Sequence, residues 1–285
     1  MKIPEPIQIA QDGIFDLDLF VKLAWAGVGY AKSAIRLSES IRRAEITLRK
    51  QDELIDEQFD KSKLEDDKKL ELFANTQESQ GFPYLYETAI IRLWTILETA
   101  VDDLVLIILE KFPKVLERKT IQNIEGPLVD FLQASTKERA ALLFERLKRE
   151  VNASFQPGVG RFEAVLKVID FGGPVPDATR RKLLELSEVR HVIVHRNSKV
   201  DSKLNKKCPW LSITVGEKIK PTHKQYMQYL LAVSCYLSEL LRRCVVTGFV
   251  KPGCPDLNDR IREFQELRDD LDKMITENRN QEDEK

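Results

Sequence analysis

The sequence YLYETAIIRLWTILETAVDDLVLIILEKF, residues 84–112, contains the longest apolar stretch of this chain. Arg92, Glu98, Asp102 and Asp103 interrupt the stretch at roughly helical intervals. A membrane-spanning helix would not tolerate so many charges, because ionised side chains lose their hydration in lipid. The segment therefore predicts the central helix of a helical bundle in water.

Polar residues of this predicted helix fall on one side of it. They recur every three or four residues, which draws a polar stripe along an otherwise apolar helix. The stripe consists of Arg92, Thr95, Glu98, Thr99 and Asp102. Such a stripe can face solvent, a partner or a site, and solvent is the commonest case.

The composition favours a folded, helix-rich protein. Of the 285 residues, 42% are hydrophobic and 32% are charged, with only 12 glycines and 12 prolines. That content is too apolar for a chain that is disordered throughout. The four cysteines form no C-x-x-C pair, and no apolar signal segment opens the sequence. We therefore expect a cytoplasmic protein with reduced thiols, no membrane segment and no zinc-ribbon site.

The net charge of −1 gives no overall attraction to nucleic acid or to an anionic membrane. A polyanionic partner would have to meet a local basic patch. Basic residues do gather around the histidines, at residues 180–182, at Arg190 and Arg196, and at residues 203–207. A solvated basic face is the commoner explanation for such a cluster.

Charge and Pro/Gly content divide the chain into three regions. Residues 1–80 form a charged N-terminal helical region, residues 81–248 a helical domain, and residues 249–285 a C-terminal helix and tail. The absence of alternating strand patterns over most of the chain predicts an all-α helical bundle.

The N-terminal region opens with prolines. Pro4 and Pro6 predict an irregular lead-in over residues 1–15, followed by a helix that begins at Asp16 or Asp18.

The rest of that region is strongly charged. Residues 36–78 contain neither Pro nor Gly and predict a long helix, broken into a hairpin near residues 60–63. Their apolar residues keep no sustained heptad, which favours helices packed on a partner surface over a long two-stranded coiled coil.

Three further helices are predicted in the helical domain by apolar periodicity. They cover residues 137–150, residues 177 to 196 with Asp177 as a capping residue, and residues 224–246. Residues 211–215 and 218–220 flank Gly216 and Glu217, a pattern that predicts a short β-hairpin. Beyond this domain, residues 256–277 predict a charged helix.

The helix over residues 177–196 carries Arg190-His191-Val192-Ile193-Val194-His195, in a chain with only three histidines. At about 100° per residue, Arg190 points into the middle of an apolar arc, and both histidines share an adjoining face. The arc consists of Leu183, Leu186, Val189, Ile193 and Val194.

A guanidinium on such an arc needs a counter-charge, because a buried unpaired cation is strongly unfavourable. The candidates are Glu98 or Asp102 on the polar stripe, or the same arc of a second subunit. In the alternative interpretation Arg190 reaches water along its own stem, and the histidines are ordinary solvated residues.

Two common kinds of site are disfavoured. The loop at residues 156–160 is not followed by Gly-Lys-Ser/Thr, which excludes a nucleotide-binding P-loop. His191 and His195 have the i, i+4 spacing of metal ligands, but the H-E-x-x-H pattern is absent. Only His223 and Cys208 are plausible further ligands, so we predict neither a metal nor a cofactor.

Arginine and histidine can together cleave RNA through its own 2′-hydroxyl. His195 can take or give a proton near neutral pH, and Arg190 can stabilise charge that develops on the phosphate. Neither an external nucleophile nor a cofactor is required.

Residues 186–197, Leu-Ser-Glu-Val-Arg-His-Val-Ile-Val-His-Arg-Asn, resemble the R-x4-H motif of the HEPN superfamily. The resemblance covers roughly residues 81–248. It implies an all-α bundle, usually a homodimer, in which two motifs meet in one RNA-cleaving cleft. Many members are ribonuclease toxins or antiviral effectors, and some are inactive binding modules.

The leading hypothesis is a metal-independent endoribonuclease of the HEPN type, with Arg190 and His195 as catalytic residues. His191 and Arg196 would position the RNA backbone. The supporting carboxylates would be Glu98 and Asp102. An antitoxin or another regulatory protein would be a further partner.

Two alternatives stay open. One is a non-catalytic HEPN-like module that binds RNA or protein through the same cleft. The other is a structural adaptor whose charged N-terminal helices mediate assembly and in which the motif is incidental.

Overall fold

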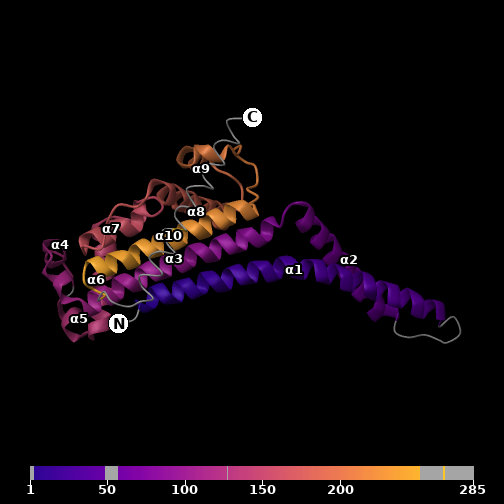
Figure 1. Ribbon diagram of the computed structural model, residues 1–285, viewed down its shortest axis with the longest axis horizontal. Helices are drawn as coiled ribbons and strands as arrows, with labels where there is room; N and C mark the ends of the chain where they lie inside the picture. Colours follow the sequence, from indigo (N-terminus) through magenta and orange to yellow (C-terminus); the bar gives the residue numbers. More distant parts are fainter. Residues whose placement is uncertain (1–2, 49–56, 127, 251–265, 267–285) are drawn as a thin grey trace.

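The protein is described by a computed structural model that covers residues 3–48, 57–126, 128–250 and 266 (Figure 1). The regular structure of these residues is helical, which confirms the predicted all-α fold. The helices of more than seven residues are α1 (Glu5–Leu48), α2 (Glu57–Ser79), α3 (Pro83–Lys111), α6 (Thr136–Glu150), α7 (Gly160–Val168), α8 (Asp177–Arg196) and α10 (His223–Val246). Short helices α4 (Lys119–Gln122), α5 (Leu128–Gln133) and α9 (Ser202–Lys207) lie between them.

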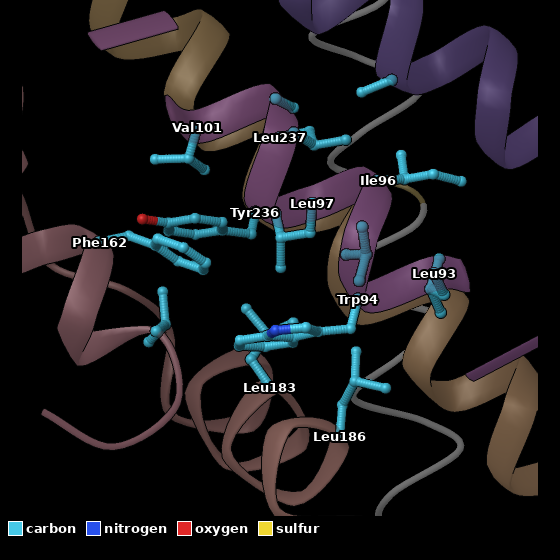
Figure 2. Close-up of a cluster of buried hydrophobic side chains, with 14 of the residues drawn as sticks. Leu93, Trp94, Ile96, Leu97, Val101, Phe162, Leu183, Leu186, Tyr236 and Leu237 are labelled. Atoms are coloured by element: carbon cyan, nitrogen blue, oxygen red, sulfur yellow. The ribbon is translucent and has the colours of Figure 1, made fainter. Parts of the chain in front are cut away.

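Helix α3 is the centre of the bundle, as its sequence predicted. Helices α1, α6, α8 and α10 all pack against it. Trp94 of α3 lies among Leu183 and Leu186 of α8, while Phe162 of α7 and Tyr236 of α10 stack nearby (Figure 2). Each fully buried large apolar side chain contributes about 1.5–3 kcal/mol, so α3 provides much of the stabilisation of the core.

The expected irregular lead-in over residues 1–15 is wrong, because α1 already begins at Glu5. Pro4 and Pro6 fit in the first turn, where backbone N–H groups have no helical partner to lose. The amides of Ile7 and Gln8 both donate to the carbonyl of Pro4, at 2.9 and 3.1 Å.

One face of α1 belongs to the same core as α3. Its buried residues lie three or four positions apart, and they are Ile7, Ala10, Ile14, Leu17 and Val21. The first half of α1 is therefore held by apolar packing against the helical domain.

Helix α2 returns along the distal half of α1 (Figure 1). Lys32 pairs with Glu78, and Nε of Arg36 lies 3.5 Å from Oε1 of Glu71. The predicted hairpin is present, but its predicted position near residues 60–63 is wrong, because α2 is continuous there. A run of residues 57–79 without Pro or Gly offers no point at which to break.

The predicted β-hairpin is also wrong. Residues 209–211 form a 3-10 helix, and Ser212 has a positive φ of 51°, so residues 211–215 are not extended. Residues 216–219 pair instead with residues 198–200, through one isolated bridge between Lys199 and Lys218. The amide of Val200 donates to the carbonyl of Glu217 at 2.9 Å.

Two smaller differences concern helix ends and the C-terminus. Asp177 is the first residue of α8 rather than its N-cap, and its carboxylate pairs with Arg180. The helix predicted over residues 256–277 falls outside the described residues apart from Glu266. Among the described helices, none combines the length and the apolar character that crossing a membrane requires.

A fully buried carboxylate fixes α8 to its neighbours. Glu185 is 0% exposed and accepts hydrogen bonds from the ammonium of Lys182 at 3.0 Å, the indole of Trp210 at 2.7 Å and the hydroxyl of Tyr229 at 2.8 Å. These donors come from α8 itself, from the segment after α9 and from α10. Burial and the adjacent carboxylate raise the pKa of Tyr229, so its hydroxyl stays a donor.

We predict that Glu185→Gln lowers the free energy of unfolding by about 3 kcal/mol, because it leaves the largely buried ammonium of Lys182 without a counter-charge. Urea denaturation monitored by circular dichroism measures the change. Glu117→Gln, at an exposed carboxylate, is the matched control. Equal unfolding midpoints for the two variants would contradict the stabilising role of the buried carboxylate.

Candidate functional site

The Arg-His motif occupies the last two turns of α8. The buried face of this helix is centred on Val189 and includes Leu186 and Ile193, which packs the helix against α3 and α10. Val194, His195 and Arg196 are exposed at its carboxyl end. The motif therefore lies on a solvent-facing edge of a well-packed helix.

The helix end is held by a tight closing turn. Asn197 and Ser198 both have positive φ values, 50° and 61°, and the amide of Ser198 donates to the carbonyl of Val192 at 3.2 Å. The amide of Asn197 donates to the same carbonyl, so the two left-handed residues close the end of the helix. The hydroxyl of Ser198 then donates to Oε1 of Glu87 on α3 at 2.9 Å, which anchors the motif to the central helix.

Arg190 lies at the margin of the apolar face and not at its middle, where the helical wheel had placed it. Its side chain is half-buried, and its Nε is buried without a hydrogen-bond acceptor. Val194, counted with the apolar arc, is 43% exposed. A buried unsatisfied N–H is costly, and because the side chain as a whole is only half-buried, the rest of the guanidinium can still donate to an anionic acceptor.

The two carboxylates proposed as partners of Arg190 are bonded elsewhere. Glu98 lies 2.8 Å from the guanidinium of Arg161 on α7, and Asp102 lies 3.4 Å from the ammonium of Lys148 on α6. The expectation that either one neutralises Arg190 within the subunit is therefore wrong. Glu98 and Asp102 therefore face α7 and α6, whereas Arg92, Thr95 and Thr99 of the polar stripe line a cavity with α1.

Asp102 and Lys148 line a cavity of about 430 Å³ between α3, α6 and α7. Burial raises the pKa of the Asp102 carboxyl, and the nearby Lys148 ammonium offsets part of that rise. The described residues that line this cavity include none from α8. The carboxylates of the stripe and the Arg-His motif are separate features.

His191 and His195 lie side by side, one turn apart on α8. Their ring centroids are 4.8 Å apart and the rings are inclined by 48°. His195 is exposed and His191 is half-buried. Burial lowers the pKa of His191, and the positive charges of Lys203 and His195 lower it further. Glu188 and Asp201 act in the opposite direction but do not reverse the shift.

Helix α9 supplies the basic residues closest to the motif. Nε of Arg196 lies 3.8 Å from the carboxylate of Asp201, whose other oxygen caps α9 by accepting from the amide of Leu204 at 2.8 Å. Lys207 pairs with Glu188 of α8. Sequence reasoning missed α9, although Asp201 followed by a short polar run is an N-cap signal.

Residues 180–182 do not share this surface, contrary to the sequence interpretation. Arg180 pairs with Asp177, Lys182 is buried against Glu185, and Arg181 lies 4.3 Å above the ring of Trp210. At about 1.5 Å per residue, the axis of α8 separates this end from the histidines by roughly 20 Å. The local basic patch therefore consists of Arg190, Arg196 and nearby lysines of residues 199–207.

Neither a metal-ligand cluster nor an ionised thiol is found among the described residues. Among them, no group of three or more His, Cys, Asp or Glu side chains is placed to hold a metal ion. Burial raises the pKa of Cys208 and Cys244 to about 12 each, so neither thiol is ionised at neutral pH. The chemistry available at the motif is that of imidazole and guanidinium.

Comparison with known proteins adds no family assignment. A scan against protein-family models, a search of curated proteins and a search of solved structures each gave no match. The fold and the local geometry therefore carry the functional argument.

We predict that His191 titrates below its ordinary pKa of 6.5, and that Lys203→Ala moves the midpoint upward by removing a neighbouring positive charge. Because the folded pKa is lowered, the folded state binds fewer protons than the unfolded state. This histidine therefore destabilises the fold as pH falls below 6.5. Proton NMR titration measures the midpoint, with His191→Gln assigning the signal. A midpoint at or above 6.5 in the wild-type protein would contradict the prediction.

Proposed function

We propose that the protein is a metal-independent endoribonuclease of the HEPN type. The observation that carries the proposal is a half-buried Arg190, with an unsatisfied Nε, on the same exposed helix end as His195. An anionic phosphate would satisfy the guanidinium and bring the adjacent ribose to the imidazole. The resemblance to HEPN toxins and antiviral effectors suggests a cytoplasmic role in defence, controlled by an antitoxin or another regulator.

The proposed reaction is an internal displacement on RNA. The 2′-hydroxyl oxygen attacks the adjacent phosphorus, the bond from phosphorus to the 5′-oxygen breaks, and a 2′,3′-cyclic phosphate forms. A neutral imidazole of His195 takes the 2′-hydroxyl proton, and the departing 5′-oxygen takes a proton from an acid. Arg190 stabilises the negative charge on the phosphoryl oxygens.

A second copy of the chain supplies the missing acid. The motif of one subunit exposes a single histidine, His195, while the lowered pKa of His191 keeps that ring neutral and unsuited to donating a proton. Two motifs that face each other would provide two exposed imidazoles. The exposed Val194 beside them offers an apolar contact between the subunits.

His191 and Arg196 are proposed to place the RNA backbone. The half-buried His191 ring packs beside His195 and restricts its position. Arg196 is exposed at the end of the helix, and its long contact with Asp201 leaves most of its donors available. Both residues would act through binding rather than through bond making.

One observation favours the alternative, a non-catalytic module that binds RNA. Among the described residues, His195 has no hydrogen bond to a carboxylate of the kind that commonly orients a catalytic histidine. The cations around it, Arg190, Arg196 and Lys203, suffice for a phosphate contact. In this alternative His195 contributes to the shape of the surface and not to proton transfer.

We predict that the purified protein cleaves single-stranded RNA in excess chelator and leaves 2′,3′-cyclic phosphate ends. His195→Ala and Arg190→Ala should each lower the rate by ~100-fold or more, because each removes a group that acts only in the transition state. Labelled RNA resolved on denaturing gels, with end analysis, gives the rates.

The matched control is Arg180→Ala, which removes an exposed arginine of the same helix about three turns before the motif. It should retain the wild-type rate. Activity that survives in His195→Ala would refute the mechanism. RNA binding without cleavage by the wild-type protein would establish the non-catalytic alternative.

We predict further that mixing the Arg190→Ala and His195→Ala proteins gives more activity than either variant alone but less than the wild type. The mixed dimer keeps one Arg190 and one His195 in the shared cleft and lacks the second imidazole. The mixture should be compared with each variant at the same total concentration after subunit exchange. Activity no greater than the sum of the two separate variants would contradict a cleft in which Arg190 of one subunit acts with His195 of the other.

A further inference from the structure

Helix α1 has a second apolar face, opposite the one that packs on α3. The face is a line of seven residues that we name the α1 stripe: Phe20, Leu23, Gly27, Tyr30, Ala34, Leu37 and Ile41. Its five large members are 52–77% exposed. Patches of large exposed apolar side chains mark binding surfaces in soluble proteins.

The neighbouring helices do not cover this stripe. Helix α2 approaches α1 from another side, through Lys32 and Arg36, and Trp25 on that side packs edge-on against Phe82. A Cβ atom added at Gly27 would meet no atom within 4 Å. Among the described residues, the large side chains of the stripe are therefore exposed along its whole length, and its distal members lie on the part of α1 that extends past the bundle (Figure 1).

The spacing of the stripe specifies another helix as its partner. Successive members are separated alternately by three and four residues from Phe20 to Ile41. This is the a and d pattern of a coiled-coil seam, sustained over three heptads. The heptad begins upstream of residue 36, which is why the apolar residues of 36–78 did not reveal it.

The borders of the stripe are small or apolar, and uncharged. The flanking e and g positions are Leu19, Ala24, Ala26, Ala31, Ser33, Ser38 and Ser40. The hydroxyls of Ser33 and Ser40 bond to carbonyls of their own helix, at 3.1 and 2.9 Å, so they need no external partner. Flanking charges normally select or reject a partner. Without them an identical helix meets no like-charge repulsion.

Large and small residues alternate in the central part of the stripe, from Leu23 to Ala34, so this part complements itself when two copies run antiparallel. In the register that pairs a positions with d positions, Leu23 meets Ala34 of the second copy and Tyr30 meets its Gly27. Phe20 meets Leu37 on either side of this centre, and Ile41, beyond it, meets Asp16. A parallel pair would set Gly27 against Gly27 and Ala34 against Ala34, which leaves voids that cost packing energy.

We propose that α1 pairs with the same helix of a second copy of this chain, antiparallel, about a two-fold axis between Val28 and Gly29. The contact is isologous, as expected for a symmetric dimer. It does not rest on the proposed ribonuclease activity, because α1 and α8 lie on opposite sides of α3 (Figure 1). The motif stays accessible when the stripes are paired, so both contacts can form in one assembly.

The first test is the mass of the full-length protein in solution. Analytical ultracentrifugation of Leu23→Glu with Tyr30→Glu should show half the wild-type mass at micromolar concentration, because a buried unpaired carboxylate at the seam weakens association by at least about 30-fold. Phe15→Glu is the control, an equally exposed apolar position of α1 outside the stripe. Circular dichroism checks that the helices persist.

A wild-type monomer, or an unchanged mass in the double variant, would overturn the proposal. So would a monomer that binds neutral phosphatidylcholine vesicles through the stripe, since the occupant would then be lipid. Loss of RNA cleavage in His195→Ala, at the wild-type mass, would concern the motif alone. The two proposals therefore fail separately.

The second test is the direction of pairing. Leu23→Cys and Ala34→Cys proteins, each carrying Cys254→Ser, are oxidised separately and as a mixture. Antiparallel pairing predicts disulfide-linked dimers mainly in the mixture, because the two positions face each other across the seam. Dimers formed equally well by each variant alone would indicate parallel pairing and overturn the proposed register.

Discussion

The structure depends on the burial of α3 on nearly all sides. An apolar helix with a single polar stripe cannot face water over most of its circumference, so other helices must surround it. Helices α1, α8 and α10 cover its apolar surface, while α6 and α7 bring basic side chains to Glu98 and Asp102. The two carboxylates of the stripe, Glu98 and Asp102, are therefore paired within the subunit, while Arg92 and Thr99 stay exposed.

That constraint explains which parts of the fold could be predicted. The bounds of α3, α6 and α10 lie within one residue of the predicted ones, because strong periodicity and local end signals determine them. Ser135 and Thr222 each form a capping box at the start of α6 and α10. The segment 216–219 was mispredicted because its pairing partner is distant in sequence, near the end of α8.

The site was predicted in its residues but not in its surroundings. The sequence identified an exposed histidine and an arginine with an unusual position on α8. It did not reveal that the buried face is centred on Val189, since this depends on how α8 is turned against α3 and α10. The roles of Lys203 and Asp201 likewise follow from the folding of α9 back against α8.

Helix α9 gives the motif a property that links ligand binding to protonation. The positive charge of Lys203 lowers the pKa of His191. An anion that neutralises Lys203 therefore removes part of that lowering. A phosphate group bound at the patch would raise the pKa of His191 toward its ordinary value, while burial would still hold it lower. By thermodynamic reciprocity, the affinity of the protein for the anion would rise as the pH falls. The bound anion would in turn favour the protonated form of His191.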